Sequence, residues 1–269
     1  MTELRDLRYE KAPQRRERVT ELIRREGFAT TSWLAQELGV SEMTVRRDLQ
    51  RLEKGGEIRV VPGGVSLRSP AGGTDFRLRL ITEEAEKRAI GATASRLVEP
   101  GSIVGIDAGS TALEVLRQLP PDFDITVVTQ SLPAMNEAAT RRDLKLMALG
   151  GIFRPEAGSF FGPGTVASVE QVHIDIAFIG ATAIQDGEAF CGNPYDAETK
   201  RAMYQSASRS VLVVDSRKFE RTAMMRIVPI SAFDTIAIDD GLSAENLQVL
   251  ENLEVDLRIA RLPKDPTSA

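Results

Sequence analysis

The sequence predicts an α/β protein in two parts, a small helical module with a β-wing and a larger domain on a mainly parallel sheet. Three observations support this. Capped apolar helices crowd the first 55 residues, and a short β-like run closed by Pro62-Gly63-Gly64 follows them. Farther along, apolar runs rich in β-branched residues alternate with helical patterns, which is typical of a parallel sheet covered on both faces.

The helices of the small module are defined by their end signals. Apolar residues at helical spacing predict a first helix from Gln14 that ends at Gly27. Thr30 can cap a second helix and Ser41 a third, which Gly55-Gly56 ends. Three helices and a small wing within about 50 residues form a winged helix-turn-helix pattern.

The larger domain is predicted from its alternating pattern. Strands are expected at 102–107, 124–129, 144–150, 174–180, 210–215, 234–239 and near 255–260. Helices are expected at 82–97, between 107 and 119, between 129 and about 139, at 194–209 and at 243–250. Shifts in composition then divide the chain. After a frayed start comes a module at 12–67, with its helix-turn-helix at about 29–48, and a Gly-, Ser- and Pro-rich linker at 68–81. A larger domain at 82–262 and a disordered tail at 263–269 follow.

Charge is uneven along the chain, and this limits the partners it can have. Residues 1–64 hold 13 Lys and Arg against 11 Asp and Glu, a net charge of +2, which leaves −7 for the rest of a chain whose total is −5. A mildly basic head on an acidic body suits local DNA contact by the head. Because the sequence has no long apolar run and no signal peptide, we expect a cytoplasmic protein without a membrane span. With one Cys and one His, we expect no internal disulfide and no zinc or haem site, while a magnesium ion bound by carboxylates remains an alternative.

The third helix carries the candidate DNA-reading face. Its apolar stripe is Val45, Leu49 and Leu52, and the opposite face is polar. Arginine there can bind two acceptors on guanine or phosphate. The alternative is a solvated charged face, and Asp48 is expected to orient Arg47 or Arg51. The candidate DNA-binding residues are Ser41, Thr44, Arg46, Arg47, Gln50, Arg51, and in the wing region Lys54 and Arg59.

These motifs give the chain a family resemblance. The stretch "VSEMTVRRDLQRLEKGGEIRVVPGGV" resembles the N-terminal signature of the DeoR family of bacterial transcription regulators, and "AFIGATAI", "AETKRAM" and "LVVDSRKF" continue it in order to about residue 240. The resemblance implies a winged helix-turn-helix joined to a Rossmann-like sugar-phosphate-sensing domain similar in fold to ribose-5-phosphate isomerase. Two residues depart from the family pattern: Pro62 stands where His is usual, and Gln130 where Asn is usual.

Strand ends in the larger domain carry the candidate effector site. At "IDAGST", Asp107 can accept from sugar hydroxyls, and the start of the following helix can hold a phosphate. A strand-end glycine can also be a plain turn, and Asp196 with Lys200 can be a surface i,i+4 ion pair. The candidate effector-binding residues are Asp107, Gly109, Ser110, Thr111, Thr129, Gln130, Ser131, Gly150, Gly151, Gly180, Asp196, Lys200 and Lys218.

Two functions are compatible with these features. The first is a repressor, or less commonly an activator, that binds double-stranded operator DNA as a homodimer or homotetramer and releases it when a phosphorylated sugar or polyol binds. The second is a sugar-phosphate isomerase or phosphatase with a DNA-binding appendage, in which Asp107 and Lys218 act as base and electrophile. The sequence gives no clear second carboxylate beside Asp107, which favours the regulator, with no catalytic residues and no cofactor.

Overall fold

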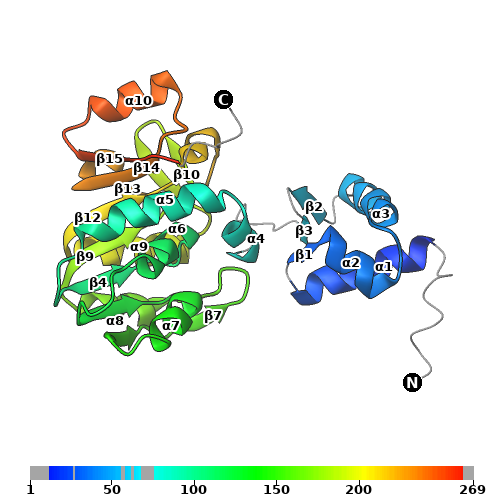
Figure 1. The fold of residues 1–269 in the computed structure, drawn as a ribbon, viewed down its shortest axis with the longest axis horizontal. Coiled ribbons are helices and arrows are strands. Elements are labelled where there is room, and N and C mark those ends of the chain that lie inside the picture. Colours follow the sequence, from blue (N-terminus) through cyan, green and yellow to red (C-terminus); the bar gives the residue numbers. More distant parts are fainter. Residues whose placement is uncertain (1–11, 27, 56–57, 62–63, 68–75, 263–269) are drawn as a thin grey trace. The chain divides into compact units, whose positions relative to one another are not determined.

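The computed structural model describes residues 12–26, 28–55, 58–61, 64–67 and 76–262. The frayed start, Pro62, residues 68–75 of the predicted linker and the 263–269 tail lie outside these ranges. The chain divides into two compact units, one made of residues 1–70 and 77–82 and the other of residues 71–76 and 83–269 (Figure 1). We call them the winged unit and the sensor unit.

The winged unit contains the three helices that the sequence predicts: α1 (Ala12–Glu26), α2 (Thr31–Leu38) and α3 (Glu42–Lys54). Thr30 caps α2, since its hydroxyl accepts a hydrogen bond from the backbone N–H of Trp33 at 3.1 Å. Gly39 ends that helix in the left-handed conformation, with φ of 62°, which favours glycine. The apolar faces of the three helices pack together, and Trp33 packs against this core.

The wing is a three-stranded antiparallel sheet in the order β1 (Phe28–Thr30), β3 (Gly64–Leu67), β2 (Ile58–Val61). Only β2 is predicted from the sequence, because its run of β-branched residues is closed by a Pro-Gly-Gly turn, whereas β1 and β3 are short and have no such signal. A Cβ added at Gly64 would lie 2.4 Å from the carbonyl oxygen of Ala29, so glycine is required where β3 crosses β1.

Residues 76–81, the end of the predicted linker, form helix α4 (Phe76–Ile81). Phe76 and Leu78 are buried, and the backbone N–H of Phe76 donates to the carbonyl of Glu156 at 2.8 Å. Two apolar anchors therefore fold this part of the linker. The Gly- and Ser-rich composition that suggests a linker ends before residue 76.

A seven-stranded sheet forms the centre of the sensor unit, with all its strands parallel. All seven strands are predicted from the sequence. Their order across the sheet is β15 (Asp256–Ala260), β14 (Thr235–Asp239), β12 (Ala207–Val213), β9 (Ile174–Ile179), β4 (Ile103–Ile106), β5 (Ile125–Thr129) and β6 (Leu144–Ala148).

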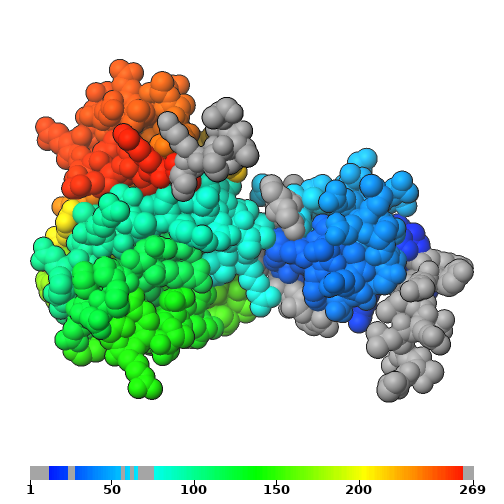
Figure 2. All heavy atoms as spheres, in the orientation of Figure 1, coloured from blue at the N-terminus to red at the C-terminus, as the bar shows by residue number. Residues whose placement is uncertain are grey.

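Helices cover the sheet. On one face α5 (Glu84–Ala94) packs on α6 (Ser110–Arg117), and α6 contacts α7 (Leu132–Ala139). The pair α8 (Pro163–Glu170) and α9 (Pro194–Gln205) also packs together, and α10 (Ala244–Glu251) precedes β15. Figure 1 shows α5 and α6 in front of the central strands, and their atoms hide these strands in the space-filling view of Figure 2.

Two predictions about this unit are corrected. The helix expected at 194–209 stops at Gln205, because residues from Ala207 onward pair with β9. The helix expected at 82–97 is α5, which ends at Ala94, and its last three predicted residues form the 3-10 turn η2 (Ser95–Leu97). Several short elements were not predicted: a hairpin, a second antiparallel sheet, α8 and two 3-10 turns. They are β7 (Ile152–Arg154), β8 (Ser159–Phe161), β10 (Ala183–Gln185), β11 (Glu188–Cys191), β13 (Met225–Pro229), η3 (Ser216–Glu220) and η4 (Ile230–Ala232).

The strand order creates a topological switch point. From β4 the chain winds outward through β5 to β6, and it then returns to the other side of β4 as β9 before winding outward through β12 to β14 and β15. In parallel α/β sheets the ligand crevice lies outside the carboxyl ends of the strands at such a point. The ends of β4 and β9, at Asp107 and Gly180, are therefore the expected centre of a site.

Within the described residues, no helix is both long and apolar enough to cross a membrane.

Candidate functional site

Helix α3 of the winged unit has one buried face and one exposed face. Val45, Leu49 and Leu52 are buried, while the candidate cations and amide of the opposite face are exposed: Arg46, Arg47, Gln50, Arg51 and Lys54. Ser41 caps the helix, since its Oγ accepts from the backbone N–H of Thr44 at 3.3 Å and lies 3.0 Å from the Thr44 hydroxyl. In the wing, Arg59 is exposed as well. These exposed cations can contact the phosphates or base edges of DNA without any change in the packing of the unit.

The predicted role of Asp48 is wrong. Its carboxylate is buried and pairs with α1, at 2.6 Å from Nε of Arg15 and 3.7 Å from Nη1 of Arg16, and not with Arg47 or Arg51. Asp48 therefore joins α1 to α3 and leaves the arginines of the exposed face to other partners. Helical spacing alone could not separate these possibilities, because the partner lies 33 residues away in the sequence.

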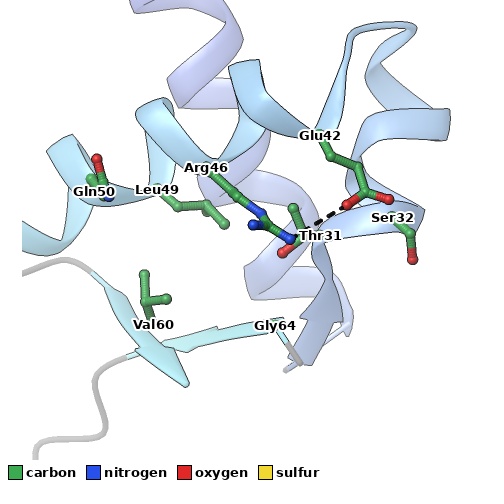
Figure 3. A pocket seen from close by; sticks show the side chains of 8 residues that line it. All are labelled: Thr31, Ser32, Glu42, Arg46, Leu49, Gln50, Val60 and Gly64. Carbon is green, nitrogen blue, oxygen red and sulfur yellow. Dashed lines mark ion pairs between the residues drawn. The ribbon is translucent and has the colours of Figure 1, made fainter. Parts of the chain in front are cut away.

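A pocket of about 330 Å³ lies between α3 and the wing (Figure 3). Val60 contributes an apolar wall of the pocket. The side chain of Arg46 points toward Glu42, one turn earlier on α3, with 3.7 Å between Nη2 of Arg46 and Oε2 of Glu42. The wing is fixed beside α3 because the backbone N–H of Val60 donates to Glu53 Oε1 at 2.8 Å. Sequence reasoning missed the residues that complete this pocket; the lining is Thr31, Ser32, Glu42, Arg46, Leu49, Gln50, Val60 and Gly64.

In the sensor unit, Asp107 is the meeting point of several elements. It follows β4 and is 1% exposed. Its Oδ2 accepts from the backbone N–H of Gly180 at 3.1 Å and pairs with Nζ of Lys200, while its Oδ1 accepts from the Gln130 side chain at 3.2 Å. One carboxylate thus joins the ends of β4, β9 and β5 to helix α9. Four of the predicted effector-binding residues, Asp107, Gln130, Gly180 and Lys200, therefore meet at the switch point.

Lys200 is buried within this group. Its Nζ also lies 3.5 Å from Oδ1 of Asp196, four residues earlier on α9. Burial by itself lowers the pKa of Lys200, but the charges of Asp107 and Asp196 outweigh it and hold the pKa above its ordinary value. A surface ion pair between Asp196 and Lys200 is therefore excluded. The pKa of the nearby Cys191 thiol is raised to about 12, mainly because the thiol is buried and to a lesser extent because of the charge of Asp196.

The start of α6 lies beside Asp107 and has free hydrogen-bonding capacity. Its N-cap is Gly109, which has no side chain to bond the first-turn N–H groups, whereas Ser131 caps α7 and Asn193 caps α9. A Cβ added at Gly109 would lie 3.5 Å from Asp107 Oδ2. Together with the buried hydroxyls of Ser110 and Thr111, this helix start can receive an anion.

Gln130 has an oxygen that the fold leaves unused. The side chain is fully buried, and its Oε1 has no hydrogen-bond partner among the described residues. Its neighbours serve the backbone: Thr129 Oγ1 donates to the carbonyl of Ile106 at 2.6 Å, and Ser131 Oγ accepts from the N–H of Ala134 at 3.4 Å. An unpaired buried acceptor is costly, so Gln130 is suited to receive a hydrogen bond from a ligand hydroxyl.

Lys218 lies at the neighbouring strand end. Asp215 follows β12, and its Oδ2 is 3.3 Å from Nζ of Lys218, with both side chains buried. β12 adjoins β9 in the sheet, so this pair lies one strand farther along the same edge than Gly180. The structure thereby places two buried lysines at the carboxyl edge of the sheet.

The predicted glycines Gly150 and Gly151 have a structural role. The carbonyl of Gly150 accepts from Thr165 Oγ1 at 2.7 Å. Gly151 has φ of 144°, and a Cβ there would lie 2.1 Å from the same hydroxyl. These contacts hold the chain between β6 and β7 against α8. Among the described residues, no cluster of three His, Cys, Asp or Glu side chains could hold a metal ion.

Comparison with known proteins now decides the family. The profile of the DeoR C-terminal sensor domain matches residues 82–240, and that of the DeoR-like helix-turn-helix domain matches residues 15–71. The chain belongs to the DeoR family. It is a DNA-binding transcriptional regulator whose winged unit is the DeoR-like helix-turn-helix domain and whose second unit is the DeoR sensor domain.

Individual relatives align along almost the whole chain. The glycerol-3-phosphate regulon repressor of Escherichia coli K12 is 29% identical over 93% of this chain and 99% of its own. The L-fucose operon activator of Haemophilus influenzae is 30% identical over 87% of this chain and 94% of its own. Among solved structures, ribose 5-phosphate isomerase A of Methanocaldococcus jannaschii matches with a TM-score of 0.36 and 20% identity over 51% of this chain and 54% of its own.

Replacing Lys200 tests the importance of the buried charges in this DeoR sensor domain. Lys200→Met leaves Asp107 and Asp196 without their cation, so we expect the sensor unit to lose about 3–5 kcal/mol of unfolding free energy. The matched control is Lys145→Met, because Lys145 pairs with Asp124 at 3.0 Å with both side chains exposed, and we expect a loss below about 0.5 kcal/mol. Urea unfolding followed by far-ultraviolet circular dichroism measures both; equal losses would show that the buried cation contributes no more than the exposed one.

Proposed function

We propose that this DeoR-family regulator represses an operon for sugar or polyol catabolism and leaves its operator when a phosphorylated sugar or polyol binds the sensor unit. The observation that carries the proposal is a buried polar site at the switch point of one unit combined with an exposed arginine face on the other. The relative from E. coli is named as a repressor of a glycerol-3-phosphate regulon, which supports a phosphorylated effector.

The chemistry of the sensor site supports a ligand with both an anion and hydroxyl groups. The uncapped start of α6 favours a phosphate, since its N–H groups and helix dipole both attract negative charge. Lys218 adds a cation at the same edge of the sheet. The unused oxygen of Gln130 needs a donor, which a sugar or polyol hydroxyl supplies. A free phosphate ion could bind the start of α6 and Lys218, but it would not supply the hydroxyl group that Gln130 requires.

The chemistry of α3 supports readout of double-stranded DNA. Arg46, Arg47 and Arg51 are exposed on one helix, and Lys54 and Arg59 extend the positive charge toward the wing. Recognition helices of this class lie in the major groove, and proteins of this class bind two half-sites as dimers. We therefore propose a homodimer or homotetramer in the cytoplasm, bound to a two-fold symmetric operator.

The alternative of an isomerase finds little support in the geometry. Isomerisation needs a base that takes a proton from one sugar carbon and returns it to the next. Asp107 is engaged by Lys200, the Gly180 N–H and Gln130, so its oxygens already have partners. Asp215 forms an ion pair with Lys218, but neither of its buried oxygens makes a hydrogen bond among the described residues, so of the two carboxylates only Asp107 is fully engaged. We infer that these carboxylates organise the site and that the protein is a sensor without enzymatic activity.

A panel of ligands tests the proposed function. We expect at least one of ribose 5-phosphate, fructose 1-phosphate and glycerol 3-phosphate to raise the melting temperature, because a ligand that binds only the native state stabilises it by about 2.7 kcal/mol at 100 times its Kd. Inorganic phosphate and the unphosphorylated compounds serve as controls. In parallel, each phosphate is incubated with the protein and the products are analysed. Turnover at enzyme-like rates, or no stabilisation by any of the three, would contradict the proposal.

Replacement of one arginine separates DNA binding from ligand binding. Arg47→Ala should reduce affinity for a duplex selected by the wild-type protein from a random pool by about 10-fold to 100-fold, because one bidentate contact to a base contributes about 1–3 kcal/mol. Ligand stabilisation should persist. Arg18→Ala removes an exposed arginine of α1 that pairs with Glu21 and should leave DNA affinity unchanged. Gel shifts that show equal affinity for the two variants would refute the assignment of α3.

A further inference from the structure

Glu83, at the start of the sensor domain, makes an unusual set of contacts. Its side chain is 5% exposed, and its two oxygens face two arginines: Oε1 is 2.7 Å from Nη1 of Arg217, and Oε2 is 3.6 Å from Nη2 of Arg221. Both arginines belong to the turn formed by η3 and the residue that ends it. A buried carboxylate thus ties the N-terminus of α5 to a segment more than 130 residues away.

That segment also carries part of the proposed effector site. Lys218 lies in η3 directly after Arg217, and Asp215 precedes the turn. An anion that binds at Lys218 therefore acts on the same short turn that holds Glu83. Three cations, Arg217, Lys218 and Arg221, fall within five residues, and Glu83 supplies the carboxylate that two of them share.

The backbone of Glu83 is in a conformation that needs support. Its φ of 49° and ψ of 41° place it in the left-handed region, which a residue with a long side chain rarely adopts. The side chain makes no capping bond to α5, although the Glu83 carbonyl accepts from the N–H of Lys87 at 3.0 Å. Arg217 of η3 and Arg221, which follows it, hold the carboxylate of Glu83 at this residue.

The position of Glu83 in the chain gives these contacts a functional meaning. The winged unit extends through residues 77–82, and Glu83 is the next residue. A change in the backbone angles of Glu83 therefore changes the direction of the segment 77–82, which leads to the DNA-binding module. The structure therefore holds a non-glycine residue in a left-handed conformation beside two ion pairs, at a point where a change in those ion pairs can change the direction of the chain.

We propose that Glu83 is the positioning residue through which effector binding reaches the DNA-binding module. Binding at Lys218 moves η3, the arginines change their contact with Glu83, and the backbone at the junction changes direction. The effector drives this step because it binds one arrangement better than the other. This inference rests on the proposed function, and it adds the path by which one site acts on the other.

The test compares two adjacent glutamates. Glu83→Gln keeps the size of the side chain and removes the charge that attracts Arg217 and Arg221. Glu84→Gln is the matched control, because Glu84 also pairs with an arginine, Arg88 at 2.7 Å, but on the exposed surface of α5. Each protein is titrated with the selected duplex, with and without saturating ribose 5-phosphate, fructose 1-phosphate or glycerol 3-phosphate, and the affinity for each compound is measured separately.

We expect Glu83→Gln to bind the active compound with wild-type affinity while the factor by which that compound weakens DNA binding falls at least about fivefold. Glu84→Gln should respond like the wild type. A wild-type response in Glu83→Gln, or a loss of response explained fully by weaker ligand binding, would overturn the proposal.

Arg217→Gln provides a second variant of the same contact. It is used if Glu83→Gln fails to fold by circular dichroism, since the Arg217 side chain is 56% exposed and its loss leaves no buried gap. The same loss of response is then expected, and a wild-type response would again overturn the proposal. If none of the three compounds stabilises the wild-type protein, the proposed function fails, and this inference fails with it.

Discussion

The sensor unit depends on the buried ion pair between Asp107 and Lys200. A carboxylate and an ammonium group out of water are expensive unless each finds its charge and its hydrogen bonds inside the protein. Asp107 meets this condition with Lys200, the Gly180 N–H and Gln130, and these partners come from three different elements. The pair therefore fixes α9 against the ends of β4, β5 and β9, and it sets the shape of the site at the switch point.

The same constraint is consistent with the sensing role that we propose for this site. Groups already engaged with one another recognise a ligand by shape and charge without having to exchange protons with it. What remains for a ligand is the capacity that the fold leaves over: the first-turn N–H groups of α6, the oxygen of Gln130 and the cationic turn at η3. The net charge is +2 over the first 64 residues and −7 over the rest of the chain, which favours DNA contact by the first part.

Features that are local in sequence could be predicted, and features that depend on distant partners could not. Thr30 and Ser41 cap helices because the capping bond spans three residues, and the strands of the main sheet were visible as apolar runs. Asp48 was misassigned because its partner, Arg15, lies in another helix. That Asp107, Lys200 and Gln130 contact one another could not be predicted, because the strand order of the sheet brings their distant segments together. Glu83 and its arginines gave no sequence signal, because a left-handed glutamate has no pattern of its own.

The central claim is that one free energy links effector binding and DNA binding. Linkage is reciprocal: if the effector weakens DNA binding by a given factor, DNA must weaken effector binding by the same factor. Isothermal titration of the stabilising sugar phosphate into free protein and into protein saturated with its selected duplex measures this directly. We expect the effector Kd to rise on DNA by the same factor, at least about fivefold. Equal Kd values in the two titrations would contradict this linkage.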